Sequence, residues 1–323
     1  MKLPRRKFLH LAAGAAALPA VSRIAGAESY PSRPVRIVVG FPAGLAPDVV
    51  ARLVAQPLSE RLGQPVVIEN RPGAGSNIGT EVVVRAPPDG HTLLMAVSTN
   101  TMNVTLYDNL NFNFVRDIMP VAGVCAVPFV MVINPSVPAQ NVFEFIAYAK
   151  ANSGKVNMAS PGIGTPPHVY GEMFKMMAGV NLVHVPYRAN FIPDLLGGQV
   201  QVAFLTMITS LPHIRDGKLR ALAMTTATRS ELLPDIRTMG EFLPGYEASG
   251  WMGVGAPRGT PAEIIAKLNK EIDAIITDRN LKERLVTLGA PPMSMTPAEF
   301  GKLIVDETDK WAKVIKFANI KVG

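Results

Sequence analysis

Three loops in the sequence carry the residues best suited to hold a small anion. They span residues 41–48 (FPAGLAPD), 98–101 (STNT) and 160–165 (SPGIGT), and each combines small residues with polar ones. Glycine lets a backbone approach a ligand closely, and the N–H groups that begin a helix have no partner inside it. Such groups attract anions, although one exposed helix end contributes only about 0.3–1 kcal/mol. Because glycine and proline also occupy ordinary turns, the loops predict a binding site only if they converge.

The segments between these loops alternate between strand and helix patterns. Apolar β-branched runs predict buried strands, and apolar residues repeated every three or four positions predict amphipathic helices. The strands are expected at 35–39, 66–69, 92–97, 156–159, 182–185, 200–204 and 219–224. In the helix expected over 49–62, Pro57 predicts a kink or a break and Gly63 is a natural end. The alternation occurs twice, which predicts an α/β chain of two lobes, each with a mixed, mostly parallel sheet flanked by helices.

Further candidate residues lie close to the three loops. Sheets of this kind bind ligands beyond the carboxyl ends of their strands, so the loops are expected to face a cleft between the lobes. His168 follows the third loop and either touches a ligand or has a structural role. Arg188 either pairs with a carboxylate through both of its terminal nitrogens or lies on the surface near Asp194. The candidate ligand-binding residues are Phe41, Ala43, Gly44, Leu45, Asp48, Ser98, Thr99, Asn100, Ser160, Gly162, Gly164, Thr165, His168, Tyr187, Arg188 and Phe204.

The common signatures of enzymes are missing from the sequence. There is no G-x-S-x-G elbow and no phosphate-binding G-x-x-x-x-G-K-[ST] loop, and the glycine at Gly79 comes one residue late for a dinucleotide fingerprint. The histidines show no metal-binding spacing, and the single cysteine, Cys125, sits in an apolar run and is expected to be an inert core residue. We therefore predict no catalysis, no metal and no cofactor, with an exported α/β hydrolase as the weaker alternative.

The first 27 residues have the features of a bacterial export signal. Residues 4–9 (PRRKFL) contain twin arginines, an apolar run follows at 11–18, and the small residues at 25–27 (AGA) form a cleavage site. Removing this leader lowers the formal net charge from +7 to +2. A nearly neutral mature chain gives no reason to expect a nucleic-acid partner. The sequence thus predicts a periplasmic protein exported by the twin-arginine route.

Several motifs together resemble one known family, the solute-binding receptors of tripartite tricarboxylate transporters, often called the Bug family. The resemblance covers the whole mature chain. It rests on residues 34–44 (PVRIVVGFPAG), 58–75 (LSERLGQPVVIENRPGAG), 88–90 (PDG), 160–165 with His168, 186–188 (PYR), 194–200 (DLLGGQV), 217–223 (GKLRALA) and 257–261 (PRGTP).

The resemblance implies a type II periplasmic-binding-protein fold whose two lobes close on a small carboxylated ligand. Residues 28–128 with 253–323 are expected to form lobe 1, and residues 129–252 lobe 2. Members of the family hold a carboxylate mainly with backbone N–H groups, hydroxyls and ordered waters from the first and third loops. The resemblance also implies membrane transporter subunits as partners, with a sensor protein as the alternative partner, and we expect the receptor to be a monomer.

The first loop departs from the family pattern in a way that bears on the ligand. Leu45 replaces the second glycine of the usual motif, and Pro47 removes an N–H donor before Asp48. Residues 189–193 (ANFIP) also replace the small residues that usually follow Tyr187 and Arg188. These changes make the expected cleft more apolar. We therefore expect a monocarboxylate, a dicarboxylate with an apolar middle or an aromatic acid, rather than citrate.

Overall fold

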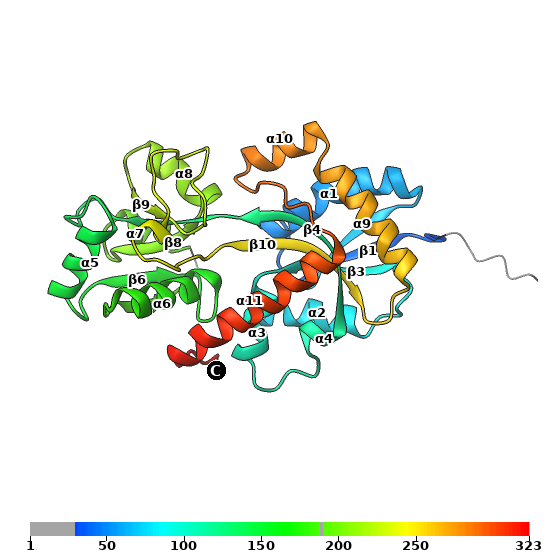
Figure 1. Cartoon of the computed structure of the whole chain (residues 1–323), viewed down its shortest axis with the longest axis horizontal. Helices are drawn as coiled ribbons and strands as arrows, with labels where there is room; N and C mark the ends of the chain where they lie inside the picture. The colour runs from blue at the N-terminus through cyan, green and yellow to red at the C-terminus, as the bar shows by residue number, and fades with distance from the viewer. Residues whose placement is uncertain (1–29, 188–189, 323) are drawn as a thin grey trace, which may run out of the picture.

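The computed structural model describes residues 30–187 and 190–322, so the predicted leader and Arg188 lie outside the described residues. Figure 1 shows two α/β lobes side by side along the longest axis of the molecule, with β4 and β10 running through the middle. The two lobes correspond to two separate sheets.

Each lobe is built on a five-stranded sheet. The first sheet has the order β2-β1-β3-β10-β4 and the second the order β7-β6-β8-β5-β9. One strand in each sheet, β10 or β5, runs antiparallel to both of its neighbours. The first sheet contains β1 (Val35–Val39), β2 (Val66–Asn70), β3 (Thr92–Val97), β4 (Ile118–Val127) and β10 (Gly250–Pro257). The second contains β5 (Phe129–Ile133), β6 (Asn157–Ser160), β7 (Val183–Pro186), β8 (Val202–Thr206) and β9 (Arg220–Met224). The predicted fold of two lobes with mixed, mostly parallel sheets is confirmed.

Helices cover both faces of the sheets, which explains why the strands are apolar without alternation. In β1, Ile37 and Val39 pack with α1 and α9, whereas Val38 packs with α2 and α11. The helices are α1 (Ala46–Leu62), α2 (Asn77–Val84), α3 (Thr99–Leu106), α4 (Phe114–Asp117), α5 (Val142–Ala151), α6 (Pro166–Ala178), α7 (Ile192–Leu196), α8 (Met207–Arg215), α9 (Ala262–Ile276), α10 (Arg279–Thr287) and α11 (Pro297–Phe317), with short 3₁₀ turns η2 (Ala74–Ser76) and η3 (Met239–Glu241).

Helix α1 is continuous, so the break predicted at Pro57 does not occur. Proline removes one backbone hydrogen bond from the helix, but Val54 and Leu58 on the same helix are fully buried and hold it against the sheet. Gly63 ends α1 as predicted, with a φ of +70° and an N–H that donates to the Ser59 carbonyl at 3.0 Å.

Two neighbouring strands connect the lobes. β4 passes through Pro128 directly into β5, and Gly250 at the start of β10 pairs with Val127 at the end of β4. Helix α11 spans the lobes as well. Phe300 packs with β10 in the first lobe, whereas Trp311 near the other end of α11 belongs to the core of the second lobe. The lobes are therefore joined at the paired strands and along α11 (Figure 1).

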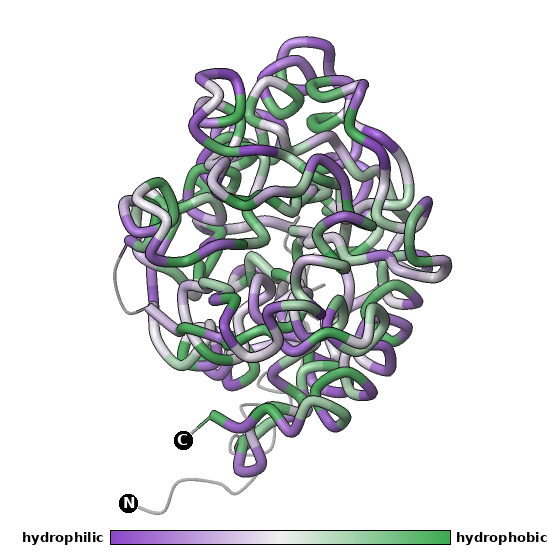
Figure 2. Tube along the Cα trace, turned by 90° about the vertical axis from the view of Figure 1, so that its left-hand side faces the viewer, coloured by the Kyte–Doolittle hydropathy of each residue, from purple (hydrophilic) through white to green (hydrophobic). Residues whose placement is uncertain are grey.

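Apolar residues are spread over both cores rather than concentrated in one segment. Figure 2 shows hydrophobic and hydrophilic stretches interspersed along the trace of the chain. In the described part of the chain, no helix is both long and apolar enough to cross a membrane.

Cys125 lies in β4 and is 0% exposed, and burial raises the pKa of its thiol to about 12, as expected for an inert core residue.

Candidate functional site

The first predicted loop follows β1 and is shaped by Asp48. This carboxylate is 2% exposed. It accepts hydrogen bonds from the Gly44 N–H at 2.9 Å and from Arg52 and the Asn70 amide at 3.0 Å. The bonds from Arg52, together with those from Gly44 and Asn70, lower the pKa of Asp48 to about 2, although burial by itself would raise it. Asp48 is therefore an ionised brace inside the loop rather than a group that faces a ligand.

Only part of the backbone of this loop is available to a ligand. The Gly44 N–H is taken by Asp48, the Asp48 N–H donates to the Leu45 carbonyl, and Pro47 has no N–H. Ala43 is exposed, and its N–H has no acceptor within residues 30–187 and 190–322. Of the predicted donors Ala43 and Gly44, the structure leaves Ala43 free.

The second predicted loop follows β3 and begins α3. Asn100 is 1% exposed; its Oδ1 accepts the Val97 N–H at 2.9 Å and its Nδ2 donates to Thr80 Oγ1 at 3.0 Å. Ser98 is buried. Thr99 is half-buried, and its hydroxyl makes no hydrogen bond to any described residue. Asn100 thus braces the loop, while Thr99 keeps a hydroxyl that a ligand can use.

The third predicted loop follows β6 and is tied together by its own polar groups. Ser160 Oγ accepts the Gly162 N–H at 3.2 Å, and Thr165 Oγ1 donates to the Gly162 carbonyl at 2.7 Å. Gly162 and Gly164 have φ angles of +142° and +76°, which other residues rarely adopt. Between them, Ile163 is 45% exposed, and its N–H has no acceptor in the described part of the chain. The free donor of this loop is therefore the Ile163 N–H.

His168 supports the third loop from inside α6. Its Nδ1 accepts the Gly164 N–H at 3.1 Å, and the residue is 5% exposed. Its ring stacks on that of His184 in β7 with centroids 3.6 Å apart, and His184 Nε2 lies 2.7 Å from Ser160 Oγ. Burial and the neighbouring His168 lower the pKa of His184 to about 4. His168 therefore acts on the loop from behind rather than by touching a ligand.

Tyr187 and Phe41 are two further predicted residues of the site. Tyr187 is half-buried, and its hydroxyl donates to Asp194 Oδ2 at 2.7 Å. Arg188, the next residue, lies outside the described residues. Phe41 is partly buried and packs against the core of the first lobe.

Phe204 does not line the cleft, contrary to the prediction. It is 0% exposed and packs beside Phe174 with ring centroids 6.1 Å apart. Its ring also lies close to Gly171 of α6. Successive residues of β8 face opposite sides of the sheet, and the side on which Phe204 falls is covered by α6.

The first two loops lie at one edge of the first sheet, and the third loop contacts α3 from the second lobe. Val39 of β1 pairs with Met95 of β3, so the first and second loops leave neighbouring strands at the same edge of the first sheet. From the second lobe, Gly164 lies against Leu106 at the end of α3, where a Cβ on Gly164 would be 2.8 Å from Leu106 Cδ1. The third loop of the second lobe therefore contacts the helix that begins at the second loop.

A fourth loop at this edge was not predicted as part of the site. It connects β2 to α2 through Ala74 and Ser76, whose φ angles of +45° and +80° are uncommon for residues other than glycine. Ser76 Oγ and Asn77 Nδ2 are buried without a hydrogen-bond partner among the described residues. Gly73 and Gly75 mark this loop in the sequence, but two glycines so close together are equally typical of an ordinary turn. Within the described residues, no group of three or more His, Cys, Asp or Glu is placed to hold a metal ion.

Comparison with known proteins identifies the family. A family model described as "Tripartite tricarboxylate transporter family receptor" matches residues 50–320 of the chain. The chain belongs to this receptor family. The receptor is 37% identical over 301 residues to protein BugT of Bordetella pertussis (strain Tohama I), and the match covers 92% of each chain.

Two solved structures are similar to the receptor over nearly its whole described length. R. palustris Rpa4515 with adipate matches with a TM-score of 0.80 and 34% identity, covering 91% of the receptor and 100% of that chain. Periplasmic binding protein BugD matches with a TM-score of 0.77 and 35% identity, covering 91% and 100%. The predicted fold and family are confirmed. The family consists of periplasmic solute-binding receptors, not enzymes, so the hydrolase alternative is not favoured.

Proposed function

We propose that this receptor captures a small organic acid with an apolar body: a dicarboxylate with a methylene middle, a monocarboxylate or an aromatic acid. One observation carries the proposal. Leu45 in the first loop is 50% exposed and Ile163 in the third loop is 45% exposed, each close to a free backbone donor. Apolar walls with a few donors suit a ligand that is charged at its end and apolar along its body. Rpa4515 holds adipate, an acid of this kind, which supports the ligand class.

These groups can supply the free energy of binding that capture of the acid requires. A micromolar dissociation constant corresponds to about −8 kcal/mol. Hydrogen bonds to a charged carboxylate each contribute about 1.5–3 kcal/mol, and each buried methylene about 0.8 kcal/mol. The N–H groups of Ala43 and Ile163 and the Thr99 hydroxyl, together with the apolar side chains, supply interactions of this size.

The capture step is proposed to close the two lobes on the acid. The proposed lobes are residues 28–128 with 253–323 and residues 129–252, although the end of α11 packs in the core of the second lobe. They rotate about 127–130 and 249–252, where Val127 and Gly250 pair, and the end of α11 moves with the second lobe. The receptor then passes the unchanged acid to the membrane subunits of a tripartite transporter. It acts as a monomer after export by the twin-arginine route and removal of residues 1–27.

Calorimetric titration of the purified receptor with adipate, benzoate, malate and citrate tests the ligand class. We expect one site of micromolar affinity for adipate or benzoate, weaker binding of malate and citrate, and recovery of the bound acid unchanged. Replacing Leu45 by glycine restores the family motif and should shift the preference toward malate. Citrate binding most tightly to the unmodified receptor would contradict the proposed ligand class.

A further inference from the structure

The shape of the third loop depends on which nitrogen of His168 carries a proton. Gly164 is buried, and its N–H donates to His168 Nδ1 at 3.1 Å. A nitrogen that accepts a hydrogen bond carries no proton, so the loop requires neutral His168 with its proton on Nε2. A proton on Nδ1 would face the Gly164 N–H directly and break this bond.

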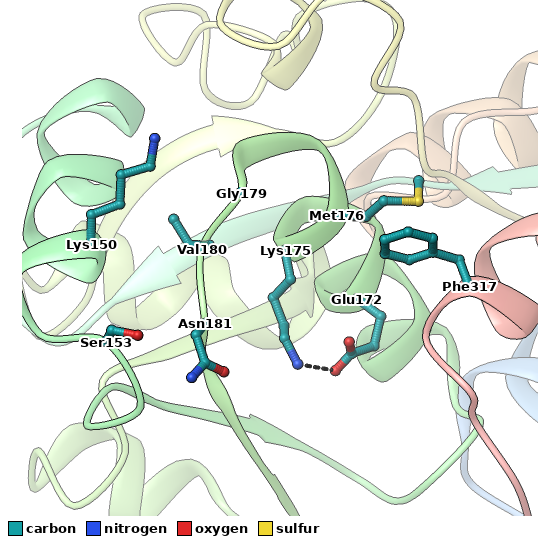
Figure 3. A pocket seen from close by; sticks show the side chains of 9 residues that line it. All are labelled: Lys150, Ser153, Glu172, Lys175, Met176, Gly179, Val180, Asn181 and Phe317. Atoms are coloured by element: carbon teal, nitrogen blue, oxygen red, sulfur yellow. Dashed lines mark hydrogen bonds and ion pairs between the residues drawn. The ribbon is translucent and has the colours of Figure 1, made fainter.

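The Nε2 side of His168 faces a carboxylate that favours this arrangement. His168 Nε2 lies 3.6 Å from Glu172 Oε1, and the Glu172 side chain is 10% exposed. Glu172 Oε1 also accepts a hydrogen bond from Lys175 Nζ at 2.8 Å, the contact drawn in Figure 3. Burial opposes ionisation of Glu172, but His168 and Lys175 hold its pKa below the ordinary value. The carboxylate is therefore charged and attracts the Nε2 proton.

His184 couples the same ring to the other end of the loop. Its ring stacks on His168 at an interplanar angle of 11°, and its Nε2 lies 2.7 Å from Ser160 Oγ. Ser160 Oγ in turn accepts the Gly162 N–H and donates to the Gly162 carbonyl at 3.0 Å. The stacked rings thus support both glycines of the loop.

We propose that Glu172 and His184 are positioning residues that hold the His168 ring with its proton on Nε2, so that Nδ1 remains the acceptor that shapes the third loop around the bound acid. The inference rests on the proposed function, because it takes the third loop as part of the site that holds the acid. The titratable and charged groups facing the pair are Glu172 and Lys175 of α6 and the Ser160 hydroxyl. Glu172 attracts the proton on Nε2, and its bond with Lys175 fixes the position of the carboxylate.

Glu172 also borders the outer surface of the second lobe. Glu172 and Lys175 line a hollow of about 540 Å³ between α5, α6 and the end of α11. Figure 3 shows Lys175 reaching along the wall of this hollow to Glu172, with Lys150 on the opposite side and Phe317 beside Met176.

Binding of adipate at pH 7.5 tests the proposal with matched variants. His168→Ala should lose about ten- to a hundredfold in affinity, the effect of one buried hydrogen bond. His168→Asn, whose Oδ1 can replace Nδ1 as acceptor, should regain much of that loss. His213→Asn on α8, away from the loop, should bind adipate as tightly as the unmodified receptor.

Two results of this titration would overturn the proposal. One is tight binding by His168→Ala, and the other is an affinity of His168→Asn as low as that of His168→Ala. Glu172→Gln should weaken adipate binding at pH 7.5, where His168 is free to move its proton to Nδ1. Unchanged affinity of this variant would also count against the positioning role.

Nitrogen NMR of the ligand-free receptor separates this inference from the proposed function. At pH 7.5, the His168 shifts should show a neutral ring with its proton on Nε2, and Glu172→Gln should increase the share of the other tautomer. A charged ring or a proton on Nδ1 in the unmodified receptor would overturn the inference. If adipate does not bind at all, the ligand class fails, and the NMR result still decides the positioning role.

Discussion

Leu106 of α3 and Gly164 of the third loop meet across the two lobes. A Cβ on Gly164 would lie 2.8 Å from Leu106 Cδ1, closer than real Cβ contacts allow. Gly164 also has a φ of +76° and donates its N–H to His168. One glycine therefore joins the lobe contact, the loop conformation and the histidine pair.

Replacing Gly164 by alanine should lower the affinity for adipate, in addition to lowering the free energy of unfolding. The left-handed backbone costs an alanine about 1–2 kcal/mol, and the clash with Leu106 displaces the loop in addition. Gly179→Ala is the matched control, because Gly179 has a φ of +62° at the other end of α6 and nothing within 4 Å of its added Cβ. Both variants should be destabilised in urea, but only Gly164→Ala should lose affinity. Equal loss of affinity in both would contradict the account.

Replacing Asp48 by alanine should destabilise the first loop. Removing the carboxylate leaves the Gly44 N–H and the Asn70 amide without their acceptor, and hydrogen bonds to charged groups contribute about 1.5–3 kcal/mol. Urea unfolding should show a loss of this size, and calorimetry should show weaker adipate binding. Glu81→Ala, which breaks an exposed pair with Arg85, should change stability by less than about 0.5 kcal/mol.

Asp48 should also contribute to the acid sensitivity of folding. Its pKa is lowered from 3.8 to about 2, so it stabilises the folded state above pH 3.8 and loses this effect as the pH falls toward 2. The free energy of unfolding of Asp48→Ala should therefore fall less steeply over this range than that of the unmodified receptor. Parallel curves for the two proteins would count against an ionised Asp48.

His184 should make folding sensitive to pH in a higher range. Burial, with the nearby His168, lowers its pKa from 6.5 to about 4, so the unfolded chain takes up this proton first. The free energy of unfolding should be largest above pH 6.5 and decrease as the pH falls toward 4. In His184→Gln this part of the decrease should be absent. Urea unfolding at pH 7.5 and pH 5 measures the difference, and an unchanged slope in the variant would be the contrary result.

Truncating Trp311 should weaken the attachment of α11 to the second lobe. Trp311 is 0% exposed, packs against Tyr170 at 5.0 Å and donates to Glu307 Oε2 at 2.6 Å. Replacing it by alanine should lower the free energy of unfolding by about 3–5 kcal/mol. Phe317→Ala on the same helix should have little effect, because Phe317 is 69% exposed. A loss at Phe317 as large as that at Trp311 would show that the packing at Trp311 is not what holds the helix.

The sequence predicts the framework of the site better than the roles of its polar residues. Strand runs followed by loops are local patterns, so the two lobes and the three loops were predictable. Whether a polar side chain at a helix start bonds its own backbone or a ligand is not a local property, and Asp48 and Asn100 are both used internally. Phe204 was wrongly expected at the ligand site because the run 200–204, which is apolar except for Gln201, does not reveal that α6 covers this side of β8. The spacing of His168 and Glu172, four residues apart on one helix, was a readable signal that was overlooked.

Paired calorimetric titrations with adipate and with adipamide, its uncharged diamide, test the central claim most directly. The two molecules share a chain length and differ in the carboxylates that the loop donors are proposed to hold. We predict a single micromolar site for adipate and no measurable heat for adipamide at the same concentrations. Equal binding of the two, or no binding of any acid in the panel, would contradict the claim that the receptor recognises a carboxylate between its lobes.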